Sequence, residues 1–221
     1  MKYRAVLQFS AVIVVLLITW GISNNSFDVN QTALNIFVSE EPVEKPKCGL
    51  SRACPLDSFA LHVTSGAATV VGPKICFEGQ IIMSTALNNV GVGLNIVVVN
   101  GDSGFVEKAS YLNTKFGVAE DILAYLKEIK PGRIVLVGTF DDVTPKLTDE
   151  MREIFVRMGS TLIKSLKSKD SWAFAGRAGT RNKSLFEKLA VNNANTNIYE
   201  GWPAMVSVSG CFPKNTVTEK P

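Results

Sequence analysis

The apolar positions along the chain predict a protein rich in β-strands. Several segments alternate apolar with polar residues, or form short apolar runs bounded by glycine, proline or asparagine, as strands do. The predicted strands cover residues 58–63, 74–77, 80–83, 94–100, 105–112, 133–140, 172–176 and 204–210. The run 94–99 is nearly all apolar and rich in β-branched residues, so we expect a central strand that is buried on both faces. The glycine-rich and asparagine-containing stretch 100–104 predicts the hairpin turn that follows it.

Two segments have the period of an amphipathic helix. The first predicted helix covers residues 118–130 and ends before Pro131. Its apolar side chains on one face are Ile122, Tyr125, Leu126 and Ile129. The second helix begins at Thr148, whose hydroxyl can cap it, and ends at Gly159. Its apolar residues at positions i, i+3, i+4 and i+7 are Met151, Ile154, Phe155 and Met158. The pattern as a whole therefore predicts β-structure accompanied by two helices.

The N-terminus predicts export from the cytosol. Lys2 and Arg4 precede an apolar run at 5–20 that is shorter than the roughly 20 residues needed to span a bilayer. We interpret residues 1–23 as a signal sequence that is cleaved, and an uncleaved membrane anchor is the alternative. Residues 24–46 carry acidic residues and prolines without periodicity, so they are interpreted as a flexible linker.

All four cysteines follow this linker, at Cys48, Cys54, Cys76 and Cys211. An even number of cysteines in an exported chain predicts two disulfides, and their spacing leaves all three connectivities open. Zinc is the alternative, but no CxxC pair is present and the single histidine, His62, lies in an alternating stretch with one solvated face. We therefore expect no metal and no cofactor.

Export would also make N-glycosylation available. The pattern Asn-x-Ser/Thr occurs at Asn24, Asn30 and Asn182. Each of the three is a candidate glycosylation site.

Length and charge indicate a single folded domain that does not bind nucleic acid. With 221 residues, 46% of them hydrophobic, the chain is long enough for one sizeable core. The formal net charge is +3, and the basic residues are scattered rather than gathered into a patch. This gives no electrostatic footprint for nucleic acid.

The common catalytic motifs are missing, which argues against an enzyme. A Ser-His-Asp or Cys-His mechanism would depend on His62, yet the chain has no GxSxG motif and its cysteines are expected to be oxidised. Gly91-Val92-Gly93 precedes a predicted strand instead of following one, so it is not a dinucleotide fingerprint. Asp141 and Asp142 are the one carboxylate pair placed for a glycosidase, and adjacent acids more often form a turn.

Short blocks spread over residues 47–213 resemble, in the same order, the interleukin-like epithelial-to-mesenchymal transition inducer family, also called family with sequence similarity 3. The matching blocks are Lys47-Cys48-Gly49 with Cys54-Pro55, Ser65-Gly66-Ala67-Ala68, Val71-Gly72-Pro73-Lys74-Ile75-Cys76, Asn88-Asn89-Val90-Gly91, Gly138-Thr139-Phe140-Asp141-Asp142, Lys146-Leu147 with Asp149-Glu150, Gly159-Ser160, Asp170-Ser171-Trp172, Tyr199-Glu200-Gly201-Trp202-Pro203 and Gly210-Cys211.

The resemblance implies an α+β fold of two packed β-sheets flanked by short helices. We expect this domain to cover residues 47–214 and a disordered tail to follow at 215–221. It also implies the disulfides Cys48–Cys76 and Cys54–Cys211. Members of the family are cytokine-like or hormone-like secreted signals. Their domain is similar to a carbohydrate-binding domain in the stem of a glycosyltransferase that elongates O-mannose glycans, which makes glycans a second class of partner.

The sequence departs from the sugar-binding relative at its ligand positions. There two arginines and an aspartate hold the sugar, and the matching residues here are Val92, Lys169 and Asp141. Asp141 alone is kept, because valine has no donor and lysine lacks the planar fork of arginine. We therefore interpret Asp141 as a turn-former first and, with Lys169, as a carbohydrate-binding candidate second. Residues 111–117 also lack the Phe-Asp-Met-aromatic block of the family.

The resemblance and the residues together predict a secreted cytokine-like protein that binds a cell-surface receptor. A lectin-like module is the alternative, and a hydrolase is a distant third. One relative forms covalent dimers through a cysteine at the position of Ala175, so we expect this chain to be a monomer or a non-covalent dimer. We expect Tyr199 and Trp202, in a loop before Cys211, to cover the core rather than to anchor a partner.

Overall fold

The computed structural model describes residues 12–21 and 45–215 of the chain. Residues 12–21 are helical. Neither described range contains a helix with the length and apolar character needed to cross a bilayer. Most of the predicted signal sequence and linker, together with Asn24 and Asn30, lies outside the described residues.

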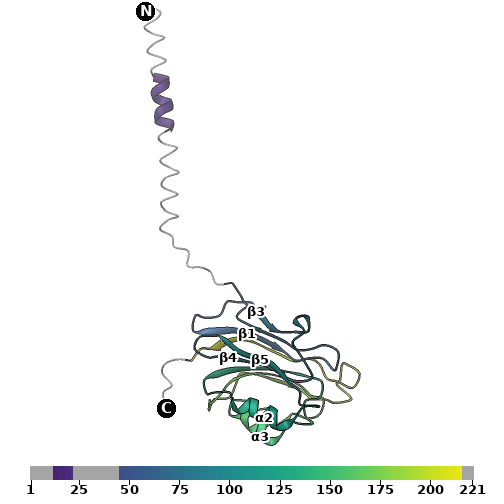
Figure 1. Cartoon of the computed structure of the whole chain (residues 1–221). Helices are drawn as coiled ribbons and strands as arrows, with labels where there is room; N and C mark the ends of the chain where they lie inside the picture. Colours follow the sequence, from purple (N-terminus) through teal and green to yellow (C-terminus); the bar gives the residue numbers. More distant parts are fainter. Residues whose placement is uncertain (1–11, 22–44, 216–221) are drawn as a thin grey trace, which may run out of the picture. The chain divides into compact units, whose positions relative to one another are not determined.

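Residues 45–215 fold into two antiparallel sheets that pack face to face, with helices below one of them (Figure 1). The four-stranded sheet has the order β3-β2-β1-β9, and the five-stranded sheet has the order β5-β4-β6-β7-β8. The strands are β1 (Ser58–Thr64), β2 (Lys74–Phe77), β3 (Gln80–Met83), β4 (Gly93–Asn100), β5 (Val106–Leu112), β6 (Arg133–Phe140), β7 (Ser171–Arg177), β8 (Phe186–Ala190) and β9 (Ser207–Pro213).

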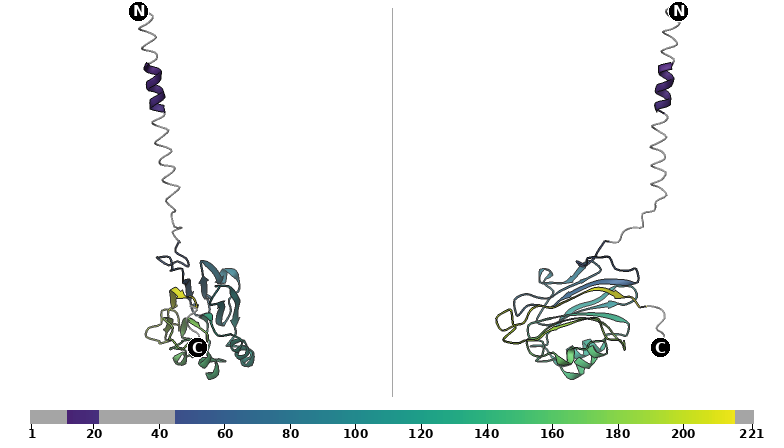
Figure 2. Two further views of the ribbon diagram at one scale, coloured as in Figure 1. Left: turned by 90° about the vertical axis from the view of Figure 1, so that its left-hand side faces the viewer. Right: turned by 180° about the vertical axis from the view of Figure 1, so that it is seen from behind.

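The five-stranded sheet is the middle layer, which explains the apolar runs of its central strands. On β4, Leu94, Ile96 and Val98 face the core against the helices, while Val97 and Val99 face the core against the four-stranded sheet. Because both faces of this sheet are covered, β4 is buried on both sides, as predicted. Figure 2 shows the same order of layers from the side and from behind.

Helices α2 (Ala119–Lys127) and α3 (Asp149–Val156) cover the outer face of the five-stranded sheet. The Thr148 hydroxyl accepts the backbone N–H of Met151 at 3.3 Å and caps α3, as predicted. Gly159, at φ +97°, follows the last turn of α3 in the conformation expected of a C-terminal glycine. Helix α2 ends at Lys127, earlier than the predicted end at Lys130.

The structure contains the disulfides Cys48–Cys76 and Cys54–Cys211, which is the pairing that the resemblance implies. The second joins residues 157 positions apart and links the segment before β1 to β9. Two packed sheets with flanking helices and two disulfides confirm the predicted α+β architecture.

Two strand predictions are wrong. The predicted strand 204–210 lies three residues too early, because Val206 bonds to Ser65 beyond the end of β1 and the pairing of β9 continues to Pro213. Strand β8 is absent from the prediction, because an edge strand that is only half-buried needs no apolar run. The 3₁₀ turns η1 (Thr85–Leu87) and η2 (Ile163–Ser165) are too short to have a periodic signal.

Candidate functional site

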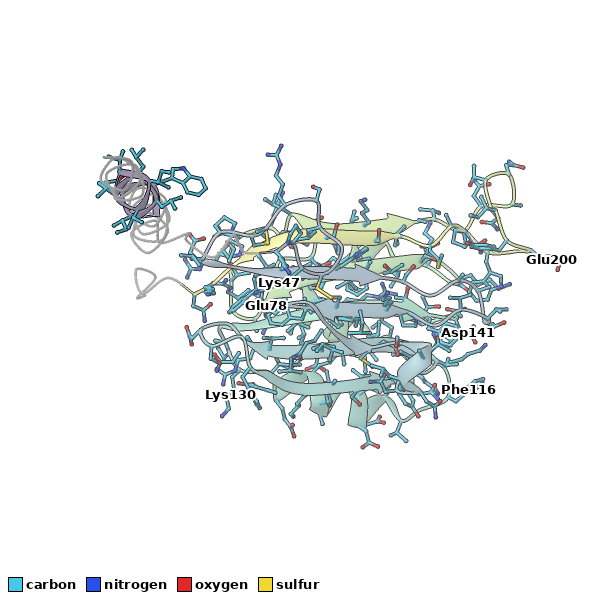
Figure 3. All side chains as sticks on the ribbon, turned by 90° about the horizontal axis from the view of Figure 1, so that it is seen from above. Lys47, Glu78, Phe116, Lys130, Asp141 and Glu200 are labelled. Carbon is cyan, nitrogen blue, oxygen red and sulfur yellow. A yellow bond between two sulfur atoms is a disulfide. The ribbon has the colours of Figure 1, made fainter. Side chains whose placement is uncertain are left out.

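The residues singled out as carbohydrate ligands gather at one end of the sandwich. Asp141 follows the last residue of β6, and its partner strand β4 begins at the same end, where Gly93 pairs with Phe140. In Figure 3, Asp141, Phe116 and Glu200 lie at this end and Lys130 lies at the other. We call the first the Asp141 end and the second the Lys130 end.

Asp141 occupies a strained turn and is almost fully buried. Its φ is +61°, in the left-handed region that aspartate tolerates better than most residues. Its backbone N–H donates to the carbonyl oxygen of Ala68 at 3.2 Å, which ties the loop after β1 to the end of β6. The interpretation of Asp141 as a turn-former is therefore consistent with its geometry.

The carboxylate of Asp141 is engaged by Lys115. The ammonium of Lys115 lies 3.1 Å from Oδ1 and 2.8 Å from Oδ2, and the Asp141 side chain is only 7% exposed. Oδ1 also accepts the backbone N–H of Asp142 at 2.6 Å. Because both oxygens already have partners, a sugar hydroxyl would have to displace the lysine.

The turn that presents Lys115 is built by Asn113. The Asn113 Oδ1 accepts the backbone N–H groups of Lys115 at 3.2 Å and Phe116 at 2.8 Å, an arrangement that fixes a tight turn. The ammonium of Lys115 also lies 5.3 Å from the ring centre of Phe116. The Phe116 side chain stands on this turn and is 73% exposed.

Sequence reasoning missed Lys115. It lies 26 positions from Asp141, so no local spacing links the two residues. The sequence did mark this loop as unusual, because residues 111–117 lack the Phe-Asp-Met-aromatic block of the family.

Asp142 points to a second loop. Its Oδ2 accepts the Ser168 hydroxyl, and its Oδ1 accepts the backbone N–H of Thr144 at 3.0 Å and the Thr144 hydroxyl at 2.7 Å. Burial raises the pKa of Asp142, but the hydrogen bonds from Ser168, Thr144 and the backbone of Lys169 outweigh it, so its pKa lies below the ordinary value. Asp142 therefore serves as an ionised link between the loops 141–144 and 166–170.

Lys169 lies in the same loop as Ser168, and its side chain contacts Trp202. Its φ is +65°, and its ammonium lies over the ring of Trp202 at 5.3 Å. The Trp202 ring is half-buried, and its backbone forms a two-way bridge with Tyr199. Lys115, rather than Lys169, supplies the ammonium that reaches Asp141.

Val92 lies in a turn that the side chain of Asn95 stabilises by hydrogen bonds to the backbone. The Asn95 side chain is fully buried, accepts the N–H of Gly91 at 2.9 Å and donates to the carbonyl of Gly91 at 2.8 Å. A side chain at Gly91 would meet the ring of Tyr111 at 2.4 Å, which explains the glycine. The structure thus brings positions 92, 141 and 169 to one end of the sandwich. Position 92 is a valine without a donor, and the charged groups of Asp141 and Lys169 already contact Lys115 and Trp202.

Exposed apolar side chains surround the Asp141–Lys115 pair. On one side the loop after β1 presents Val70, which is 80% exposed, and on the other the turn of Lys115 presents Phe116. The contacts Ala68–Asp141 and Lys115–Asp141 join both loops to the same aspartate. We call five of the exposed apolar residues of this end the end surface: Val70, Val71, Leu87, Tyr111 and Phe116.

The other candidate residues are placed elsewhere. Asn182 lies in the loop after β7 at the Lys130 end and is exposed. His62 is half-buried, with its Nδ1 3.2 Å from the carbonyl oxygen of Cys48, and the described residues contain no group of three side chains suited to hold a metal ion. Ala175 is fully buried between the sheets.

Comparison with known proteins places the chain among cytokine-like relatives. Residues 92–180, which include Asp141 and Lys169, match the family model described as interleukin-like EMT inducer. The chain is 38% identical to protein FAM3C of Homo sapiens over 224 residues, covering 97% of this chain and 99% of that protein. It is 41% identical to protein FAM3D of Homo sapiens over 220 residues, covering 96% and 98%. With protein FAM3C of Danio rerio the identity is 46% over 167 residues, covering 76% and 74%.

Proposed function

The chain belongs to the interleukin-like EMT inducer or FAM3 family of cytokine-like proteins, and on that premise we propose that it is a secreted ligand that acts by binding a cell-surface receptor. Family membership gives no indication of an enzyme. The two disulfides support secretion, because such bonds persist in oxidising compartments.

The observation that carries the proposal is the end surface. Val70 and Phe116 are large apolar residues exposed on neighbouring loops, and the Asp141–Lys115 pair lies between those loops. Exposed apolar side chains around a charged, partly desolvated centre have the composition of a protein–protein interface. The rigid sandwich holds these loops, as scaffolds hold recognition loops in other proteins. We therefore propose the end surface as the receptor contact.

The test compares two phenylalanines of similar exposure at opposite ends. Phe116 is 73% exposed on the end surface, and Phe105 is 69% exposed in the turn between β4 and β5. Labelled protein with Phe116→Ser should bind responsive cells about 30-fold more weakly, as expected for an aromatic anchor worth about 2 kcal/mol. Phe105→Ser is the matched control and should bind as the unmodified protein does.

Both variants must first show the thermal unfolding midpoint of the parent protein. This is expected because neither ring is part of a buried core. Equal binding by folded Phe116→Ser and Phe105→Ser would remove the end surface from consideration as the receptor contact.

A lectin-like function is the second candidate, and one observation favours it. The loops of Asp141 and Lys169 are joined by the Asp142–Ser168 hydrogen bond, and the Lys169 ammonium lies over the half-buried ring of Trp202. Two observations argue against a lectin: Val92 has no hydrogen-bond donor, and Asp141 already forms an ion pair with Lys115. A glycan array with purified protein separates the two functions: sugar binding that Asp141→Ala abolishes in folded protein would favour the lectin.

A further inference from the structure

The loop after β7 holds an exposed sequon in a fixed position. The triplet Asn182-Lys183-Ser184 lies between β7 and β8, and Asn182 is exposed. The backbone N–H of Asn182 donates to the Thr180 hydroxyl at 3.0 Å, and the N–H of Ser184 donates to the carbonyl of Gly159 at 2.8 Å. The loop is therefore anchored on both sides of the asparagine, which itself stays outside the core.

Ser184 has a structural use in addition to its place in the sequon. Its hydroxyl donates to the carbonyl oxygen of Ala175 and accepts the backbone N–H of Phe186 at 2.9 Å. Because a threonine keeps this hydroxyl and also keeps the sequon, Ser184→Thr is a conservative control. Asn182 can be replaced without loss of those two hydrogen bonds.

The same asparagine lines an apolar groove at the Lys130 end. The groove has a volume of about 370 Å³, and its lining includes the apolar residues Met158, Leu185, Phe186, Phe212 and Pro213. The Leu185 side chain is 93% exposed, the most exposed large apolar residue in the described part of the chain. Covering this side chain would be favourable, because it removes apolar surface from water.

The groove also runs along a sheet edge. Strand β8 is the last strand of the five-stranded sheet, paired with β7 on one side, and within the described residues no strand pairs with its other side. An open edge with an exposed leucine next to it is a template for pairing with another chain. Proteins usually guard such edges with charges, prolines, bulges or a covering segment.

We propose that Asn182 carries an N-linked glycan whose first sugars lie over this groove and cover Leu185 and the β8 edge. The proposal rests on the proposed secretion, since the modification takes place in the secretory pathway. Its attachment point follows the end of β7 that pairs with the start of β6, opposite the end surface, so the glycan would leave the proposed receptor contact open.

The covalent step balances without an oxidant or reductant. The donor is an oligosaccharide linked through pyrophosphate to a lipid, and an oligosaccharyltransferase brings it to the chain. Asn182 Nδ2 forms a bond to the anomeric carbon of the first N-acetylglucosamine and loses one proton. The bond from that carbon to the pyrophosphate oxygen breaks, and the lipid pyrophosphate leaves with the electron pair.

The first experiment measures occupancy. The full chain is expressed in a secreting animal cell, and protein from the medium is digested and analysed by mass spectrometry before and after treatment with an N-glycosidase. We expect the peptide that contains Asn182 to carry a glycan and to contain aspartate at position 182 after the treatment. Asn182→Gln should lose this glycan, and Ser184→Thr should keep it.

An unmodified Asn182 in secreted, disulfide-bonded protein would overturn the inference while the proposed function stands. Protein that stays inside the cell with four free thiols would overturn the proposed function as well, so the two failures are distinguishable.

The second experiment measures whether the glycan covers the groove and Leu185. Fluorescence of an apolar dye is compared for glycosylated protein, Asn182→Gln, and the double variant Asn182→Gln/Leu185→Ser, all from the same cells. We expect the dye signal to rise in Asn182→Gln and to fall back when Leu185 is also replaced. Equal dye binding by all three proteins, with Asn182 occupied in the parent, would show that the glycan does not cover the groove and would refute that part of the proposal.

Discussion

The two ends of the sandwich differ because a disulfide supplements ion pairs such as Arg133–Glu107 at the Lys130 end. At the Lys130 end, the Cys54–Cys211 disulfide ties the entry to β1 to β9, and the N–H of Asn215 donates to the carbonyl of Gly101 at 3.0 Å. At the Asp141 end, the loops meet through the Asp141–Lys115 ion pair and the Asp142–Ser168 hydrogen bond.

The difference indicates that one end stabilises the fold and the other presents side chains to a partner. The disulfide does not depend on pH, whereas the link from Asp142 to Ser168 at the other end involves a carboxylate whose pKa is lowered in the folded protein. The loops of the Asp141 end can therefore present Val70 and Phe116 to solvent while polar contacts beneath them fix their position. The comparison can be tested by removing each kind of bond in turn.

Loss of the Cys54–Cys211 disulfide should have the largest effect. The double variant Cys54→Ser/Cys211→Ser should lower the free energy of unfolding by about 2–5 kcal/mol, the usual cost of removing a native disulfide. Hydrogen exchange should accelerate first at 54–57 and 213–215, next to the lost link. Urea unfolding with hydrogen-exchange mass spectrometry measures both effects, and unchanged stability would contradict the role assigned to this bond.

Removal of Lys115 should have the next largest effect, because it leaves Asp141 buried and without its countercharge. Lys115→Met should cost about 2 kcal/mol, less than a fully buried pair because the lysine itself is partly exposed. Thermal unfolding measures the loss.

The matched control is Lys108→Met, which removes an exposed ion pair with Glu128 and should cost clearly less than Lys115→Met, because exposed pairs contribute little to stability. The double variant Lys115→Met/Asp141→Asn should recover part of the loss. If the two single lysine variants were equally stable, the Asp141–Lys115 pair would not be holding its end of the sandwich.

Ser168→Ala should have the smallest effect, and that effect should depend on pH. The pKa of Asp142 is lowered in the folded protein, so the carboxylate contributes stability above its unfolded pKa of about 3.9 and loses it as the pH falls through the folded value. Removing one donor should cost about 0.5 kcal/mol near neutral pH and nothing in strong acid. Denaturant unfolding across this range measures the difference, and a cost independent of pH would argue against a link through the ionised Asp142.

Much of the fold could be predicted because its signals are local. The apolar run of β4, the cap at Thr148 and the glycine at 159 each record a local requirement, and each is found where it was expected. Strand β8 carries no such signal, because its place at the sheet edge depends on pairing with β7 and not on its own periodicity.

The candidate site could be predicted only in part. The sequence indicated that positions 92, 141 and 169 belong together, and the structure brings them to one end. The partner of Asp141 could not be found in this way, because Lys115 reaches it across two loops from a distant part of the chain. Ion pairs between loops depend on how those loops are folded, and a single sequence does not record that.

The most direct test of the receptor contact is hydrogen exchange on the native protein with and without membranes of responsive cells. Binding through the end surface predicts slower exchange at 65–73 and 113–118, with no change at 100–106 in the turn that carries Phe105. Slower exchange at 100–106 alone, with 65–73 and 113–118 unchanged, would contradict the account.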